Sequence, residues 1–444
     1  MTSLSPNRTF TPLEESLPRL EAAVSPLVGI VKGTVATMNA PDEATLPHCA
    51  CELASSARTL GTPTVAYGSG ADPDPLRARA AALGEALERY SGVFVPAELL
   101  HRTTARKLGR AAVRPSRFAL FHPTQFDIPG FPLVPFTEDT TTTFVAGIDL
   151  ADGSPAFLPA ELVYMSRPDA RLRPVAHATS SGLACGPSLE EATLAALLEL
   201  VERDAVMLVW KCRLSLPLLE WADDPEIAAL ADRFFAPTRV EYSVVDGSCF
   251  LGVPVAIAVL HGPRCFGAAL SVGAAAAARV QAAWLKAVAE SFGVYRWLRS
   301  PAADDTPWPV EADSVESFDD HTRFYAAEER AVLAGFLDTS TERRSTLSVP
   351  ELPGTTPCAQ IREIVTRLER HQISAYLVDV TSPDVRELGL SVARVIAPEL
   401  CALDVSHRAR FQGGVRLTHA AHEAGLASKP LAVDELNPLP HPFP

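Results

Sequence analysis

The chain has 444 residues, of which 47% are hydrophobic and 21% are charged, which is ample material for a large buried core. Its formal net charge of −14, with no run of Lys or Arg, excludes recognition of nucleic acid by bulk positive charge. The sequence has no uninterrupted apolar run of about 18 residues and no N-terminal export signal, so we expect a cytoplasmic protein without a membrane span.

The cysteine pattern gives no indication of a structural metal. None of the eight cysteines forms a CxxC pair, and without an export signal free thiols are expected. The run His48-Cys49-Ala50-Cys51 has the wrong spacing for zinc and no second cluster to complete four ligands. A zinc site is therefore not expected.

The first part of the chain is predicted to hold one long helix among irregular segments. Residues 1–20 are polar, and residues 40–75 are predicted to be loop because they end in the turn-rich run YGSGADPDP. A helix is predicted over residues 76–93. Residues 101–142, with many prolines and aromatics, are predicted to be irregular surface.

Strands and a second helix follow. Apolar alternation predicts strands over residues 141–150 and 155–165, and residues 189–211 are predicted to form a helix. The acidic, proline-bearing residues 299–320 are predicted to be a surface loop. The tail LNPLPHPFP cannot form a helix or a central strand, because proline lacks a backbone donor, so a stiff extended arm is expected.

Two later stretches resemble each other. VEYSVVDGSCFLGVPVAIAVL and ISAYLVDVTSPDVRELGLSVARVIAP both run from an apolar strand to an aspartate, Asp246 or Asp379, then through a turn with serine to a second strand. This similarity indicates a duplicated sheet architecture. We therefore expect an α/β (α+β) fold in which helices pack on mixed sheets and the site lies between halves.

The first predicted helix has an apolar side and a charged side when it is turned by 100° per residue. A charged helix face is usually solvated, but small alanines beside these acids leave room for another group to come close. The apolar set is Leu76, Leu83, Leu87 and Tyr90, and the charged set is Glu85, Glu88 and Arg89 with Ala78, Ala81 and Ala82.

The second predicted helix carries Glu191, Ala195, Glu199 and Glu202 in one stripe and is apolar on its other sides, so it should be buried. Unpaired carboxylates in such a place cost several kcal/mol each or take up protons. A divalent cation removes the difficulty, and oxygen ligands favour Mg²⁺, which usually completes its shell with phosphate oxygens.

Each glutamate pair is followed by an arginine, Arg89 or Arg203, placed to meet phosphate oxygens or to neutralise the acids. No GxxxxGK[ST] loop occurs, so the chain is not a P-loop enzyme. Geometry alone leaves two interpretations open: a Mg²⁺–nucleotide site, or a structural network of ion pairs.

Several segments together resemble one family. SSGLACGPSLEEATLAALLELVERDAV, with ALGEALERYSG, closely resembles the YcaO family of ATP-dependent enzymes that activate the peptide backbone, typified by azoline-forming cyclodehydratases. RTFTPLEESLPR is similar to its opening segment, GVPVAIAV and VARVIAPEL to its later strands, and PHPFP to the PxPxP end of the azoline-forming branch.

The resemblance implies a YcaO-type fold with mixed sheets, helices and a central cleft for ATP and Mg²⁺. It also implies an N-terminal segment over residues 1–23 that contributes to the fold, a YcaO domain over 24–436 and a proline-rich arm over 437–444.

Site residues follow from the resemblance by motif position. Glutamates would hold the metal, namely Glu85, Glu88, Glu199 and Glu202. The wider set that binds nucleotide and metal would be Arg8, Ser16, Arg19, Glu85, Glu88, Arg89, Glu191, Glu199, Glu202, Arg203, Glu290 and Arg394. The chain departs from the family at Ala81, Pro187 and Gly293, where serine, asparagine and glutamine are common, which bears on fine coordination and not on nucleotide binding.

The implied reaction joins a Cys, Ser or Thr side chain of a precursor peptide to the preceding carbonyl, with the amide oxygen leaving as phosphate. The terminal carboxylate of Pro444 is a candidate proton acceptor or site organiser. The resemblance also implies a homodimer. Because no winged-helix-like module precedes the domain, a leader-peptide-binding partner of the E1-like or ocin-ThiF type is expected.

Three alternatives stay open. Another YcaO chemistry, such as thioamide or amidine formation, would use the same ATP site, although the PxPxP tail argues against it. The chain could instead be a non-catalytic scaffold that binds a peptide or a partner. A kinase or ligase acting on a small molecule is the third alternative.

Overall fold

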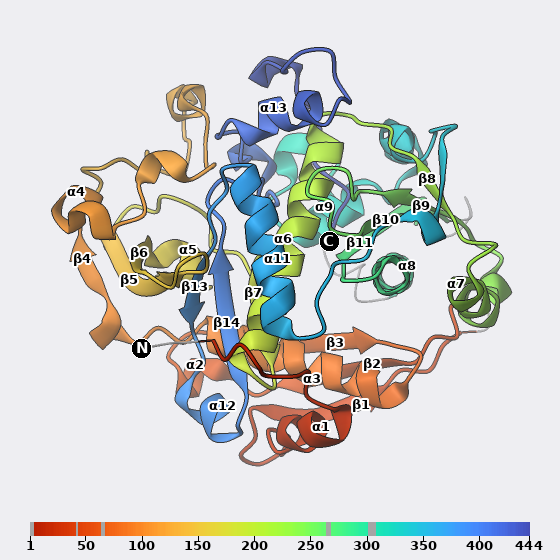
Figure 1. Ribbon diagram of the computed structural model, residues 1–444, viewed down its shortest axis with the longest axis horizontal. Helices are drawn as coiled ribbons and strands as arrows, with labels where there is room; N and C mark the ends of the chain where they lie inside the picture. Colours follow the sequence, from red (N-terminus) through yellow and green to blue (C-terminus); the bar gives the residue numbers. More distant parts are fainter. Residues whose placement is uncertain (1–3, 41–42, 64–66, 263–267, 301–307) are drawn as a thin grey trace. The chain divides into compact units, whose positions relative to one another are not determined.

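The computed structural model describes residues 4–40, 43–63, 67–262, 268–300 and 308–444 (Figure 1). Its internal contacts divide the chain into two units, each assembled from segments far apart in the sequence. Unit 1 comprises residues 1–37, 47–200 and 353–400, and unit 2 comprises residues 38–46, 201–352 and 401–444. The segment boundaries expected from the family, after residues 23 and 436, remain a prediction.

Unit 1 contains two sheets. One has the strand order β1-β2-β3, and the other has the order β4-β5-β13-β14-β7 with β6 paired to β5. The strands are β1 (Val31–Ala36), β2 (His48–Leu53), β3 (Tyr67–Ala71), β4 (His101–Thr103), β5 (Thr142–Asp149), β6 (Pro155–Pro159), β7 (Leu183–Gly186), β13 (Tyr376–Asp379) and β14 (Ser391–Ile396). The helices are α1 (Leu13–Glu21), α2 (Ser56–Thr59), α3 (Pro75–Gly92), α4 (Ala105–Leu108), α5 (Ala160–Val163), α11 (Pro357–Arg370) and α12 (Pro383–Glu387).

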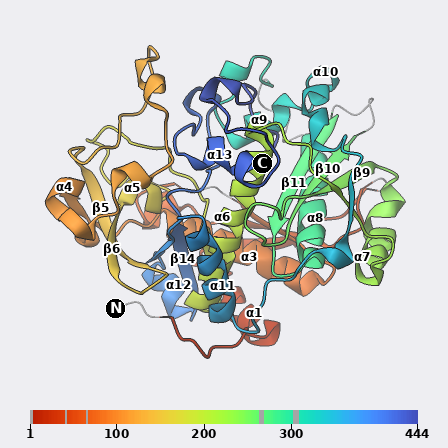
Figure 2. The same cartoon turned by 45° about the horizontal axis from the view of Figure 1, so that its top comes forward.

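Unit 2 is built on one sheet of order β11-β10-β9-β8-β12, with β11 at an edge. Helix α8 packs along β10 and β11 (Figure 2). The strands are β8 (Leu218–Glu220), β9 (Glu241–Asp246), β10 (Val255–His261), β11 (Leu270–Ala276) and β12 (Arg343–Ser345). The helices are α7 (Pro225–Leu230), α8 (Val280–Leu298), α9 (Phe318–Phe324), α10 (Glu328–Ala331) and α13 (Arg416–Glu423).

Helix α6 (Leu189–Lys211) belongs to both units, since the division falls between Leu200 and Val201. The predictions of a helix over residues 189–211 and of one over 76–93, which is α3, are confirmed. None of the helices in the described part of the chain is long and apolar enough to cross a membrane.

Four element predictions are wrong in part. Residues 101–142, predicted to be irregular, contain β4 and α4, and residues 299–320, predicted to be a loop, run into α9 at Phe318. Residues 155–165 form a strand only as far as Pro159, after which the chain turns into α5. Residues 40–75, predicted to be loop, contain β2 and β3. The run YGSGA of β3 looks like a turn because of its glycines, but these glycines let the strand lie directly on a helix.

Strand β3 packs against the small residues of α3. A Cβ at Gly70 would lie 2.3 Å from the Ala78 carbonyl oxygen, and one at Gly68 would lie 2.4 Å from that of Ala82. Ala78 and Ala82 are buried accordingly. The group that the alanines were expected to admit beside the glutamates is therefore β3. Leu76 is 53% exposed, so it is not part of the apolar face.

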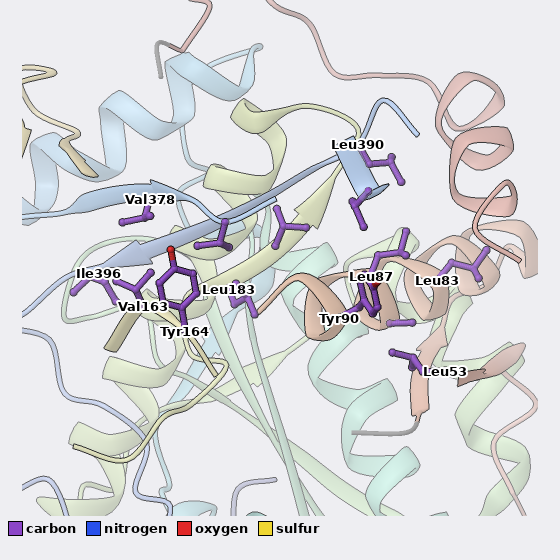
Figure 3. Packing of buried hydrophobic residues seen from close by; sticks show 14 of the residues in the cluster. Leu53, Leu83, Leu87, Tyr90, Val163, Tyr164, Leu183, Val378, Leu390 and Ile396 are labelled. Atoms are coloured by element: carbon purple, nitrogen blue, oxygen red, sulfur yellow. The ribbon is translucent and has the colours of Figure 1, made fainter. Parts of the chain in front are cut away.

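The rest of the predicted apolar face of α3 lies in the core of unit 1. Leu83, Leu87 and Tyr90 are buried in one cluster with Leu183 of β7 and Ile396 of β14 (Figure 3). Gly92 allows this approach, because a Cβ there would lie 2.6 Å from a methyl carbon of Leu183. The core thus fixes which face of α3 the glutamates occupy.

The predicted duplication appears as two antiparallel strand pairs. β9 pairs with β10, and β13 pairs with β14. Asp246 ends β9 and Asp379 ends β13, so each aspartate closes the first strand of its pair. One pair belongs to the sheet of unit 2 and the other to the larger sheet of unit 1.

A buried ion pair anchors α6 within unit 2. The Asp204 carboxylate accepts hydrogen bonds from Arg416 Nε at 2.8 Å and Nη2 at 2.5 Å, and from the Cys401 amide at 3.0 Å.

Asp204→Ala should lower the free energy of unfolding by about 3–5 kcal/mol, because it leaves a buried guanidinium without its counter-charge. Urea denaturation measures this loss. Asp139→Ala removes an exposed partner of Arg106 and should leave the midpoint almost unchanged; equal effects would contradict the interpretation.

Candidate active site

Helix α6 is mostly buried, and its most accessible line carries the acidic residues; Leu189 and Leu200, elsewhere on the helix, are half-buried. Leu194, Leu197, Val201, Met207 and Leu208 are all buried, as their apolar character predicts. The predicted acidic stripe forms the open line: Glu191, Glu199 and Glu202 are half-buried and Ala195 is exposed. These carboxylates thus lie along the most accessible line of a helix that is otherwise mostly buried.

In unit 1, β3 and α3 fix Glu85. Its carboxylate accepts hydrogen bonds from the Ser69 amide at 2.5 Å and the Ser69 hydroxyl at 3.3 Å. Arg89 pairs with Glu85 at 2.6 Å one turn along α3, and both side chains are about a quarter exposed, at 27% and 29%. Arg89 thus neutralises Glu85 in this structure, which is one of its two expected roles.

Strand β7 lies beside two of the predicted ligands. Glu199 accepts the amide of Gly182, the residue before β7, at 3.0 Å. Burial raises the pKa of the Cys185 thiol on β7, and the nearby charge of Glu88 raises it further. Gly182 has φ +78°, and a Cβ there would lie 2.4 Å from the Val395 carbonyl oxygen, so only glycine fits.

The N-terminal segment is tied to the start of α6. Ser188 caps the helix by accepting the Glu191 amide at 3.2 Å, and its hydroxyl donates to the Glu191 carboxylate at 3.0 Å. The Thr11 hydroxyl donates to the same carboxylate at 2.7 Å. Arg8 lies 3.9 Å from Glu190, which also accepts the Ser5 amide at 2.6 Å. Glu190 is thus a partner of this segment that was not predicted from the sequence.

The other predicted residues of the opening segment make local contacts. The buried Ser16 donates to the Leu13 carbonyl oxygen at 3.3 Å. Arg19 donates to the carbonyl oxygens of Gly389 and Pro187 at 3.3 Å and 3.5 Å. Arg19 therefore reaches the turn that leads into α6.

Arg394 of β14 connects the loop before β7 to helix α5. It is only 3% exposed, and it donates to the Thr179 carbonyl oxygen at 2.7 Å and to that of Leu162 at 2.6 Å. These contacts hold the loop before β7 against α5. Its expected contact with phosphate remains a prediction.

Unit 2 brings three predicted residues into one pocket with the end of the chain. The pocket has a volume of about 20 Å³ and is lined by Glu202, Arg203, Val206, Ala274, Glu290, Leu403, Phe443 and Pro444. The edge strand β11 orients its two acids, because the amides of Ala276 and Ala274 donate to Glu202 at 3.3 Å and to Glu290 at 2.7 Å. Two glutamates, an arginine and Pro444 thus line one pocket.

The C-terminal arm contains neither helix nor strand, as predicted, but it bends at Leu439, and Pro440 to Phe443 are buried. His441 and Phe443 are 1% and 3% exposed. The Asn437 amide donates to the Lys211 carbonyl oxygen at 2.8 Å, and Trp210 Nε1 donates to that of Leu439 at 3.2 Å. The end of α6 therefore holds the arm whose last residue lines the pocket.

The donor set fits a hard cation, since carboxylate oxygens are what Mg²⁺ prefers. Among the described residues, no group of three or more His, Cys, Asp and Glu side chains lies close enough together to hold one metal ion. Glu85, Glu88, Glu199 and Glu202 therefore remain a prediction as metal ligands. Backbone amides orient several of the acids: those of Ser69, Gly182 and Ala276 donate to Glu85, Glu199 and Glu202, and that of Ala274 donates to Glu290. These donors were not predicted from the sequence.

Comparison with known proteins gives a family and a fold. A family model described as YcaO cyclodehydratase, ATP- and Mg²⁺-binding, matches residues 67–401. Among curated proteins, no relative matches.

Solved structures share the fold. A heterocyclase in complex with substrate and cofactor is 24% identical with a TM-score of 0.81, over 100% of this chain and 59% of its own. The heterocyclase TruD is 24% identical with a TM-score of 0.70, over 100% and 55%. YcaO from Methanopyrus kandleri, bound with AMPPCP and Mg²⁺, is 21% identical with a TM-score of 0.60, over 88% and 91%. The chain thus spans less than two thirds of the two heterocyclases.

Proposed function

The chain belongs to the YcaO family, and from this membership we propose that it is an ATP-dependent cyclodehydratase that forms thiazolines or oxazolines from Cys, Ser or Thr of a ribosomally made precursor peptide. The observation that carries the proposal is the pocket of unit 2, where Glu202, Arg203 and Glu290 lie with the terminal Pro444. Acids suited to a cation, a phosphate-binding guanidinium and a free carboxylate are the groups that this reaction requires.

The reaction replaces a poor leaving group by a good one. The peptide's side-chain thiol or hydroxyl adds to the preceding carbonyl carbon, and the former carbonyl oxygen then takes the γ-phosphoryl group of ATP, releasing ADP. Loss of phosphate and of the amide proton closes the C=N bond. Per ring, the peptide loses one water and one ATP becomes ADP and phosphate.

The protein's own groups have distinct parts in this proposal. When bound, Mg²⁺–ATP supplies the phosphoryl group and screens its charge. Glu199 and Glu202, half-buried on the open line of α6, are anionic oxygen donors for the cation. Arg203 directly follows Glu202 and is suited to phosphate oxygens.

The Pro444 carboxylate lies in the same pocket as Glu202 and Arg203, and is suited to accept a proton from the peptide. This part of the proposal gives the C-terminal arm a role in the reaction. It also separates ATP binding from proton removal from the peptide, because ATP can bind without this proton acceptor.

Two finer proposals rest on the family resemblance. A leader-peptide-binding protein of the E1-like or ocin-ThiF type would deliver the substrate, and the chain would form a homodimer. Co-elution with such a protein and light scattering of the purified chain test these two points separately.

Mass spectrometry of a candidate precursor peptide, incubated with the protein, ATP, Mg²⁺ and the leader-binding partner, tests the activity. A loss of about 18 Da per modified residue, matched by released phosphate and abolished when the acceptor Cys, Ser or Thr is replaced by alanine, supports azoline formation. Exchange of oxygen for sulfur would indicate a thioamide. Loss of water without a Cys, Ser or Thr acceptor would indicate an amidine. A peptide that stays unmodified while ATP is not consumed would favour a scaffold.

A further inference from the structure

The segment of the C-terminal arm before Pro444 is held by side chains that the proposed reaction does not use. Three successive carbonyl oxygens of the arm accept hydrogen bonds from three different aromatic or imidazole side chains. Trp210 Nε1 donates to Leu439 at 3.2 Å, the Tyr325 hydroxyl to Pro440 at 2.5 Å, and His321 Nδ1 to His441 at 3.0 Å.

A pair of stacked histidines completes this arrangement. The rings of His321 and His441 lie 3.8 Å apart between centroids and are inclined by only 8°. Both are fully buried, at 0% and 1% exposed. His441 Nε2 donates to the Asp404 carbonyl oxygen at 2.8 Å. Each ring therefore donates one N–H to a carbonyl oxygen.

The geometry points to a latch, formed by His321, Tyr325 and Trp210, that fixes the register of the arm and so positions the Pro444 carboxylate in its pocket. This inference rests on the proposed function for its catalytic consequence. Its structural part, the docking of the arm, stands on the contacts alone. The three residues are positioning residues, because they contact the arm and do not line the pocket.

Register matters here because the pocket is small. Shifting the arm by one residue would move Pro444 by about 3.3–3.6 Å, the rise of an extended chain. Such a displacement would change the position of Pro444 relative to Glu202, Arg203 and Glu290, which line the same pocket. Prolines at 440, 442 and 444 stiffen the arm, so a register fixed at residues 439–441 is transmitted to its end.

Apolar packing alone would not fix the register. A buried extended segment rich in proline has few N–H groups and cannot form a strand ladder, so its carbonyl oxygens need donors from elsewhere. The latch supplies one donor for each of the three successive carbonyl oxygens. The His321→Phe change keeps an aromatic ring in the stack and removes its donor, which separates hydrogen bonding from packing.

Hydrogen exchange measures docking without reference to activity. The arm has four amides, at Asn437, Leu439, His441 and Phe443, because its other residues are prolines. In Tyr325→Phe and His321→Phe the protection of the last three amides should fall at least tenfold. His321→Asn keeps a side-chain N–H near the position of Nδ1 and should restore most of it. Tyr242→Phe alters a half-buried tyrosine in another aromatic cluster of unit 2 and is the matched control.

Kinetics measure the catalytic consequence. In Tyr325→Phe, kcat for peptide modification should fall about tenfold, while KM for ATP stays within about twofold. In a chain that also carries one extra residue after Pro444, the same substitution should cause no further loss, because the two changes disrupt one arrangement.

Unchanged arm protection in both Tyr325→Phe and His321→Phe, or an equal loss in Tyr242→Phe, would overturn the latch. If protection falls but the unaltered protein modifies no peptide, the latch stands and the proposed function fails. If protection falls and kcat does not, the arm docks through the latch but its position does not govern the reaction, and the catalytic part of the inference is wrong.

The latch should also respond to acid. Burial lowers the pKa of His321 to about 4 and that of His441 well below its usual range, against partial compensation by Asp404 and Asp320. Lys211 opposes protonation of His441, and His407, itself buried with a pKa of about 4, lies nearby. When the arm is undocked, the two histidines should have the ordinary pKa of about 6.5, which is higher than in the docked arm. Protonation therefore favours the undocked arm. Arm protection, corrected for intrinsic exchange, should be full at pH 7 and fall from pH 6.5 to 4; constancy over this range would contradict a neutral stack.

Discussion

Glu202→Gln is expected to lower the rate of ATP- and Mg²⁺-dependent peptide modification at least about 100-fold, the usual effect of weakening a metal site or a charge-stabilising group. The change removes the negative charge but keeps an oxygen that accepts the Ala276 amide, so the fold should be retained. A neutral amide oxygen is a much weaker ligand for a hard cation than a carboxylate. The expected loss is therefore electrostatic and not steric.

Two measurements separate binding from folding for this variant. Mg²⁺–ATP should raise the melting temperature of the unaltered protein, since a ligand that binds only the native state stabilises it, and this shift should largely disappear in Glu202→Gln. The melting temperature without ligand should change little. Phosphate release in the presence of peptide measures the rate directly.

The matched control lies on another helix. Glu369→Gln changes an exposed glutamate at the end of α11 and should leave both the rate and the ligand-induced shift as in the unaltered protein. Glu199→Gln should resemble Glu202→Gln. If both variants on α6 behave like the control, the stripe is a structural ion-pair network, which is the interpretation that the sequence alone left open.

Helix prediction worked where local patterns agree with tertiary packing. α6 is apolar on most of its circumference and begins at a serine cap, so its limits follow from the sequence. α3 begins after Asp74, which accepts the Leu76 amide at 2.9 Å, with proline in the first turn. In contrast, β3 exists because its glycines fit against α3, and this depends on a contact between separate segments.

The acidic residues of the site were predictable, but the groups that orient them were not. A stripe of three glutamates on an apolar helix is visible in the sequence, and so is the spacing of Glu85 and Arg89 that forms an ion pair. Glu199, Glu202 and Glu290 each accept a hydrogen bond from a backbone amide, a group that every residue except proline has. Which amides remain free for a side chain depends on the order of strands, such as the edge position of β11.

Adding one glycine after Pro444 is expected to lower the turnover of peptide modification at least about 100-fold while leaving KM for ATP within about threefold. The extra residue moves the terminal carboxylate by about 3.3–3.6 Å and places a peptide bond where the charge was. In a pocket of about 20 Å³ the added residue must displace either the arm or Glu202, Arg203 and Glu290.

An insertion of one glycine after Gly425, in the exposed segment that follows α13, adds the same residue to unit 2 away from the pocket and should leave turnover unchanged.

A C-terminal amide at Pro444, made by semisynthesis, then separates the two effects of the extension, because it removes the charge and keeps the length. If the amide is as slow as the extended chain, the carboxylate itself accepts the proton or orients the site. If the amide is fully active and only the extension is slow, the arm acts by filling the pocket, and the proton acceptor must be another group, with Glu290 in the same pocket as the next to test. Unchanged turnover in both variants would remove the arm from the reaction altogether.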